Sequence, residues 1–168
     1  MTGATRKTAA GRTAAPRRRR ANRPRILLLQ GANMTYLGKR QPELYGTTTR
    51  AELDALLAAH ARARGVDLDI VYTHVEGEAV ARIYGALDAG LDALVMNPAG
   101  FLYAGFALRD CLRAIPVPIV EVHMTNIEKR GVRTITAEAA TGYIAGFGID
   151  SYILGLDAAL GLLARAKP

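Results

Sequence analysis

The chain has 168 residues, half of them apolar, which suits one globular domain with a sizeable hydrophobic core. Its formal charge of +7 comes from the start of the chain, because the first 25 residues hold nine of the 22 Lys and Arg residues and none of the 15 acids. The remainder is slightly acidic, no window approaches the roughly 20 apolar residues of a membrane span, and a single cysteine excludes an internal disulfide framework.

Residues 1–24 form a basic tail that we predict to be disordered, because its Ala, Thr, Gly, Pro and Arg residues offer almost nothing to bury. One interpretation is an inert or solubilising tail, or a start codon assigned too far upstream. Another is weak binding to a polyanion such as nucleic acid, or a transit-like segment. A secretory signal is not expected, since the apolar run Ile26 to Leu29 is too short. Residues 25–168 are expected to form a single domain in the cytoplasm, with no membrane partner.

From residue 25 onward, short β-like runs alternate with helical patterns, which indicates a parallel sheet covered by helices on both faces. The first run, RILLLQ, has a continuously apolar centre, as a strand buried on both sides must have. Thr49 and Glu52 form a capping box that begins the first long helix. Strands are predicted at 25–30, 67–73, 92–97, 117–123 and 142–148, and helices at 50–65, 76–89, 104–114 and 151–166. This order predicts an α/β fold of flavodoxin-like type, with a doubly wound five-stranded parallel sheet in a three-layer α/β/α arrangement.

The residues at the strand ends are the candidate site, because ligands in such sheets bind beyond the carboxyl ends of the strands. Most of them carry amides, imidazoles or hydroxyls: Gln30, Gly31, Asn33, His74, Asn97, Pro98, His123, Thr125 and Asn126. The sequence has no glycine-rich phosphate-binding motif of the GxGxxG or GxxxxGK[ST] kind, which removes the main support for a nucleotide site. The site is therefore expected to hold a small polar molecule.

His123 is the strongest catalytic candidate among the three histidines. It ends an apolar strand two residues after Glu121, so both side chains point to the same face and the carboxylate can orient or charge the imidazole. The alternative is a core histidine satisfied by its neighbour. His60 is expected at the surface or an edge, and His74 is ambiguous. No HxxxH or HExxH spacing predicts a metal site.

Two potential nucleophiles have simpler explanations. Cys111 lies on the apolar face of a predicted helix and is expected to be a small buried hydrophobe. Ser151 is expected to cap the last helix rather than to serve in a catalytic triad.

Tyr45 lies in the segment LGKRQPELYG, between two glycines and five residues after Arg40. A free tyrosine has a pKa near 10, so its phenolate at pH 7 costs roughly 4 kcal/mol, at about 1.36 kcal/mol per unit. An adjacent guanidinium favours the phenolate, and Arg40 is the natural source of it. On this interpretation Gly38 and Gly46 allow the loop to close over a substrate. The alternative is that Tyr45 only packs and Arg40 is a solvated charge.

The segment LLLQGANMTYLGKRQPELYGTTT resembles the amino-terminal motif of type II 3-dehydroquinate dehydratases, in which a strand runs into an NGPNLNLLGxREPxxYG-like sequence. The resemblance continues through MNPAG, ALRD, PVPIVEVHMTN and GFGIDSYILGL, and so covers nearly all of residues 25–163 in order. It implies a flavodoxin-like subunit, commonly part of a homododecamer built as a tetramer of trimers. It also implies dehydration of 3-dehydroquinate to 3-dehydroshikimate through an enolate, with no cofactor and no metal.

The resemblance implies a role for each matching residue. Tyr45 matches the tyrosine that takes the proton, and Arg40 matches the arginine that favours its ionised form. Asn33 matches the asparagine that helps hold a water against the enolate oxygen, and His123 matches the general acid that protonates the departing hydroxyl. Substrate-binding or positioning roles are implied for Asn97, Glu121, Met124, Thr125 and Arg133.

Several positions depart from the family pattern. Tyr103 stands where the family has a substrate-contacting histidine, and His74 stands where it has an asparagine. Gln30, Ala32 and Gln41 replace an asparagine, a proline and a glutamate. The segment between Arg130 and Arg133 is one residue short, so either arginine could clamp substrate hydroxyls.

Three functions are compatible with this pattern. The first is 3-dehydroquinate dehydratase itself, and the second is a dehydratase of the same mechanism acting on another cyclic β-hydroxy ketone. The third is a non-catalytic protein whose tail binds nucleic acid.

Overall fold

The computed structural model describes residues 23–166, and the predicted tail lies almost wholly outside this range. Five parallel strands form one sheet in the order β2-β1-β3-β4-β5. The strands are β1 (Arg25–Ala32), β2 (Asp67–Tyr72), β3 (Ala93–Ala99), β4 (Ile119–His123) and β5 (Gly142–Ala145). The main helices are α2 (Arg50–Ala63), α3 (Glu76–Asp88), α4 (Phe106–Ala114) and α5 (Asp150–Arg165). The predicted flavodoxin-like fold is confirmed.

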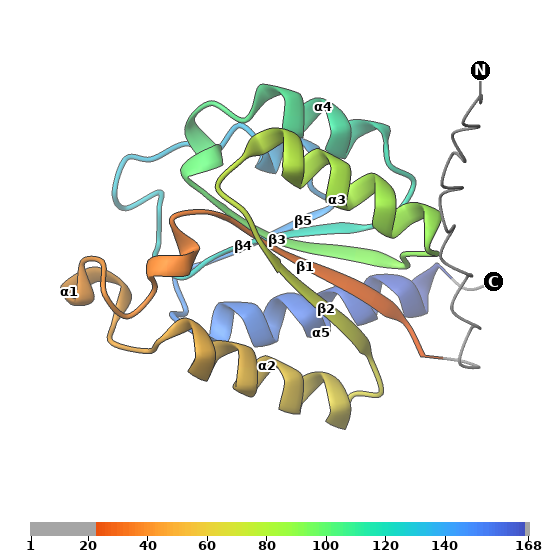
Figure 1. Ribbon diagram of the computed structural model, residues 1–168, viewed down its shortest axis with the longest axis horizontal. Helices are drawn as coiled ribbons and strands as arrows, with labels where there is room; N and C mark the ends of the chain where they lie inside the picture. The colour runs from red at the N-terminus through yellow and green to blue at the C-terminus, as the bar shows by residue number, and fades with distance from the viewer. Residues whose placement is uncertain (1–22, 167–168) are drawn as a thin grey trace, which may run out of the picture.

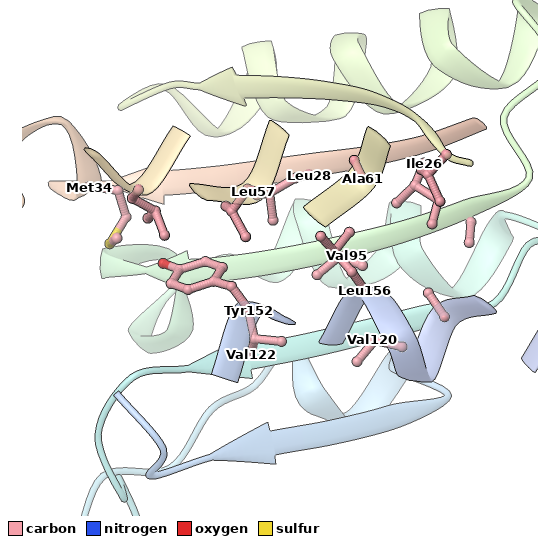
Figure 2. Close-up of a cluster of buried hydrophobic side chains, with 14 of the residues drawn as sticks. Ile26, Leu28, Met34, Leu57, Ala61, Val95, Val120, Val122, Tyr152 and Leu156 are labelled. Atoms are coloured by element: carbon pink, nitrogen blue, oxygen red, sulfur yellow. The ribbon is translucent and has the colours of Figure 1, made fainter. Parts of the chain in front are cut away.

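The helices form two layers, with α3 and α4 on one face of the sheet and α2 and α5 on the other (Figure 1). Each face has its own apolar core. Leu27, Leu29 and Ile83 belong to the core under α3 and α4, whereas Leu28 and Leu57 belong to the core under α2 and α5 (Figure 2). Alternate residues of β1 thus serve opposite cores, which explains its continuously apolar sequence.

A local signal places the start of α2 but not that of α5. The Thr49 hydroxyl accepts a hydrogen bond from the Glu52 backbone N–H, and the Glu52 carboxylate accepts one from the Thr49 N–H, so the predicted capping box is present. Ser151 was expected to cap α5, and this prediction is wrong. The helix begins at Asp150, and the buried Ser151 hydroxyl accepts a hydrogen bond from the Phe147 N–H.

Several strand ends differ from the prediction, and those of β1 and β5 shape the edge of the sheet. β1 continues to Ala32, so Gln30 and Gly31 lie inside the strand and are buried. A Cβ on Gly31 would lie 2.1 Å from the Pro98 carbonyl oxygen, so only glycine allows this close approach of β1 to β3. β5 ends at Ala145, because Gly146 takes a φ of +100° and turns the chain.

The segment between β1 and α2 contains a short helix, α1 (Pro42–Tyr45), where a loop was expected. It follows Gln41, which has a φ of 41°, and it ends at Gly46, which has a φ of 78°. In Figure 1, α1 projects from the body of the molecule beyond the carboxyl ends of the strands. Within residues 23–166, no helix is both long and apolar enough to span a membrane.

Candidate active site

A cavity of about 230 Å³ opens at the carboxyl edge of the sheet, where β1, β3 and β4 end. Its walls come from residues 33–45, from the end of β3 with the turn that follows, and from the end of β4 with the chain up to residue 132. It is lined by most of the residues singled out from the sequence: Asn33, Arg40, Tyr45, Asn97, Tyr103, His123, Met124 and Thr125. These side chains therefore lie together beyond the carboxyl ends of the strands, where ligands bind in parallel sheets.

His123 is held against Glu121, as the two-residue spacing on one strand face predicts. Its Nε2 lies 2.8 Å from Glu121 Oε1, and both side chains are buried. Thr134 Oγ1 donates a second hydrogen bond of 2.6 Å to the same carboxylate oxygen. Because Nε2 is turned to Glu121, Nδ1 is the ring nitrogen that remains available to a ligand. Glu121 itself lies behind the imidazole and does not line the cavity.

Tyr143 on β5 lies beside His123, a contact that sequence analysis did not predict. The two ring centroids are 5.5 Å apart, and the rings are inclined by 50°. Burial raises the pKa of Tyr143 to about 12, and the carboxylates of Glu128 and Glu121 act in the same direction. Tyr143 therefore stays a neutral phenol at pH 7 and covers the His123–Glu121 pair from one side.

Tyr45 contacts two guanidinium groups, of which only Arg40 was predicted. The Arg40 Cζ lies 4.9 Å from the centroid of the Tyr45 ring. Arg130 Nη1 donates a long hydrogen bond of 3.4 Å to the Tyr45 hydroxyl and a shorter one of 3.0 Å to Thr125 Oγ1. Arg130 thus faces the phenol oxygen, whereas Arg40 lies over the ring. The cavity therefore presents two positive charges beside the Tyr45 phenol.

Asn97 forms the floor of the cavity and is connected to the core through a buried chain of polar groups. Its Oδ1 accepts a hydrogen bond from the Ala99 N–H, and its Nδ2 donates one of 2.8 Å to the Tyr152 hydroxyl. That hydroxyl donates in turn to Gln30 Oε1 at 3.0 Å. Figure 2 shows the Tyr152 ring between α5 and the sheet, with its oxygen directed toward the end where Met34 lies. Burial raises the pKa of Tyr152 above its ordinary value, so it remains a neutral hydroxyl.

Ala99 ends β3 in the cavity wall with φ 45° and ψ −117°, a conformation that only glycine adopts without strain. We expect Ala99→Gly to raise the free energy of unfolding by about 1 kcal/mol, because relief of the strain outweighs the extra chain entropy of glycine. Urea unfolding followed by circular dichroism measures this change.

Ala55→Gly is the matched control for Ala99→Gly, because it makes the same chemical change at an exposed position of α2. It should lower the stability by about 1 kcal/mol. A loss of stability in both variants would contradict the strain at Ala99.

Tyr103 and the two candidate arginines take different places relative to the cavity. Arg133 is exposed and does not line the cavity, whereas Arg130 does. Tyr103 lines the cavity but is 65% exposed, which places it at the rim rather than the floor. The sequence contains no local signal for either position, because each depends on how the chain after β3 and β4 folds back.

The remaining candidates lie away from the cavity. His60 Nε2 is 2.9 Å from Asp157 Oδ1, where α2 meets α5. Cys111 is buried, as predicted for a small hydrophobe. No group of three or more His, Cys, Asp and Glu residues in the described part of the chain could hold a metal ion.

The comparisons with known proteins agree with one another. The family model described as Dehydroquinase class II matches residues 24–160. A 3-dehydroquinate dehydratase from Desulforudis audaxviator is 43% identical, with 85% of this chain and 97% of the relative covered. Another from Syntrophotalea carbinolica is 40% identical, with 83% of this chain and 96% of the relative covered.

Solved structures show the same relationship. The type II dehydroquinase from Propionibacterium acnes is 33% identical with a TM-score of 0.76, over 85% of this chain and 99% of that one. The type II dehydroquinase from Butyrivibrio crossotus is 26% identical with a TM-score of 0.78, over 82% of this chain and 98% of that one. A match across nearly the whole of these relatives, together with their fold, shows that this chain belongs to the class II dehydroquinase family.

Proposed function

We propose that this chain is a 3-dehydroquinate dehydratase, a hydro-lyase that converts 3-dehydroquinate to 3-dehydroshikimate by trans-elimination of water. The names of the relatives support the activity. The observation that carries the proposal is one cavity that holds a tyrosine beside two guanidiniums and a histidine backed by a buried carboxylate. The reaction needs a base and an acid, and these two groups supply them.

The mechanism consists of two proton transfers. The substrate carries a hydroxyl β to a ketone, so loss of the proton next to the ketone gives an enolate. Tyr45, as phenolate, takes this proton, and the Asn33 amide helps to hold a water against the enolate oxygen. His123 then gives a proton to the β hydroxyl, which leaves as water while the C=C bond forms. No electron is gained or lost, so we propose that the enzyme needs no cofactor and no metal.

Substrate binding is assigned to the polar groups that surround this pair. We place Asn97 under the ring of the substrate, and the turn at Met124 and Thr125 around its carboxylate. Of the two arginines considered for the substrate hydroxyls, Arg130 is better placed than Arg133, because it lines the cavity. Glu121 keeps the imidazole of His123 oriented through their 2.8 Å contact.

The two guanidiniums should act on the base to different degrees. We expect Arg130→Ala and Arg40→Ala each to lower kcat, because each removes a positive charge that lies beside the proposed base. The loss should be larger for Arg130, whose Nη1 faces the phenol oxygen. Steady-state enone formation measures it.

Arg62→Ala serves as the control for these arginine variants, since Arg62 is exposed on α2. It should leave kcat unchanged. An unchanged kcat in both site variants would show that neither arginine assists the base.

A dehydratase of the same mechanism that acts on another cyclic β-hydroxy ketone is the second candidate. Tyr103 favours it, because a phenol at the rim replaces the imidazole expected from the family pattern. An ultraviolet assay for the conjugated enone decides between the two. Rapid enone formation from 3-dehydroquinate supports the first function, and no enone at any substrate concentration contradicts it.

The assembly and the location of the protein are part of the same proposal. We propose a cytoplasmic homododecamer, a tetramer of trimers, in which residues 25–168 form one domain and residues 1–24 are dispensable for catalysis. Light scattering of the purified protein measures the assembly. The protein with residues 1–24 deleted should keep its turnover, whereas any salt-sensitive binding to nucleic acid should disappear with the tail.

A further inference from the structure

His74 follows β2 and reaches across to the turn that follows β1. Its Nδ1 accepts a hydrogen bond of 3.1 Å from the Asn33 backbone N–H. Its Nε2 lies 2.8 Å from Thr35 Oγ1. Both ring nitrogens are therefore used on one short turn, and this turn carries Asn33 into the cavity wall.

The two contacts define the protonation state of His74. A backbone N–H can only donate, so Nδ1 must be the unprotonated nitrogen of a neutral imidazole. Nε2 then carries the proton and donates to the Thr35 hydroxyl. A doubly protonated ring would present an N–H to the Asn33 N–H and would lose this hydrogen bond.

Asn33 needs such support because its backbone is left-handed, with φ 79° and ψ −2°. Asparagine tolerates this region better than most residues, but the conformation is still less favourable than a right-handed one. Within the turn, the Asn33 carbonyl accepts a hydrogen bond from the Tyr36 N–H at 3.1 Å. The hydrogen bond to His74 constrains the backbone N–H of the same residue.

The position of the Asn33 side chain depends on this backbone conformation. A Cβ on Gly100 would lie 3.3 Å from Asn33 Nδ2, so the amide is packed closely against the turn after β3. A change in the Asn33 dihedral angles would move the amide away from this place, because the side chain turns with the backbone.

We propose that His74 is a positioning residue for the dehydration: its Nδ1 holds the Asn33 backbone in the conformation that directs the Asn33 amide into the cavity. This inference rests on the proposed function for the role of Asn33. His74 does not line the cavity and its two nitrogens are already engaged, so it acts through Asn33 rather than on the substrate.

The test compares two substitutions that each keep one half of the imidazole. In His74→Asn, an amide oxygen stands at the distance of Nδ1 from the backbone and can still accept from Asn33. In His74→Gln, the amide stands at the distance of Nε2 and can still reach Thr35 but not Asn33. We expect His74→Asn to keep kcat within about threefold. We expect His74→Gln to lower kcat about tenfold or more with little change in KM, because the enolate exists only after the substrate has bound.

A double-mutant cycle separates positioning from general damage. In an Asn33→Ala background, His74→Gln should have almost no further effect on kcat, since the group that it positions is gone. Equal losses in His74→Asn and His74→Gln, or additive effects of His74→Gln and Asn33→Ala, would overturn the inference. Thr35→Val should keep kcat near that of the unaltered protein, because it leaves the bond to Nδ1 in place.

A second measurement does not depend on activity. In the unaltered protein, long-range ¹H–¹⁵N spectra should show His74 Nδ1 without a proton and Nε2 with one. The backbone N–H of Asn33 should exchange slowly with solvent. His74→Gln should abolish the slow exchange, and His74→Asn should retain it. A protonated Nδ1, or fast exchange of the Asn33 backbone N–H, in the unaltered protein would refute the role of His74. An absence of enone from 3-dehydroquinate, with these spectra as expected, would instead refute the proposed function.

Discussion

Tyr45→Phe is expected to lower kcat by about 10²–10⁴-fold, the usual contribution of a general base, with a much smaller change in KM. The substitution removes only the hydroxyl, so the ring keeps its contact with Arg40 and the cavity keeps its shape. The hydroxyl is the atom that Arg130 faces and the one proposed to remove the proton from carbon. Steady-state enone formation measures the loss.

Tyr36→Phe is the matched control for Tyr45→Phe. Tyr36 belongs to the same connection between β1 and α2, but its side chain is 62% exposed and does not line the cavity. It should turn over substrate at the normal rate. Near-normal turnover of Tyr45→Phe would transfer the role of base to another group and would leave the two guanidiniums without a catalytic purpose.

His123→Gln is expected to reduce dehydration by a similar factor of about 10²–10⁴, because it removes the general acid. Glutamine is preferable to alanine here. Its amide stands at the distance of Nε2 and can still donate to Glu121, whereas His123→Ala leaves a buried carboxylate without its partner. Loss of one partner of a buried pair typically costs about 3–5 kcal/mol of stability, which would confuse the kinetic result.

Deuterium exchange distinguishes the acid from the base. If His123 acts only after the enolate has formed, His123→Gln should still exchange the proton next to the ketone of 3-dehydroquinate with D₂O while it makes little enone. Tyr45→Phe should do neither. Nuclear magnetic resonance of recovered substrate measures the exchange. Full dehydration by His123→Gln, or exchange in Tyr45→Phe, would reverse or remove these assignments.

The order of strands and helices could be predicted because its signals are local. The apolar run of β1 and the capping box at Thr49 and Glu52 each act over a few residues, and the structure agrees with them. The short helix α1 was missed because its residues give mixed signals. Pro42 can begin a helix, but Gly46 ends it after a single turn.

Pairs close in sequence were also predictable at the candidate site. Glu121 and His123 are two residues apart on one strand, so the alternation of side chains places both on the same face before anything is known of the fold. Arg40 and Tyr45 are only five residues apart in one segment, which keeps their side chains close. The family resemblance implied that these two pairs act at one site, and the cavity at the carboxyl edge of the sheet contains Arg40, Tyr45 and His123.

The sequence by itself determined the fold class, the family and the kinds of chemical group at the carboxyl edge, because these follow from periodicity, capping and motif order. Only the tertiary structure decided that Arg130 faces Tyr45 across 85 residues, that Tyr152 connects Asn97 to Gln30, and that His74 holds Asn33 across 41 residues. The physical reason is that such hydrogen bonds depend on the packing of whole strands and helices. Distant residues meet only when that packing is complete, and no local pattern records which of them will touch.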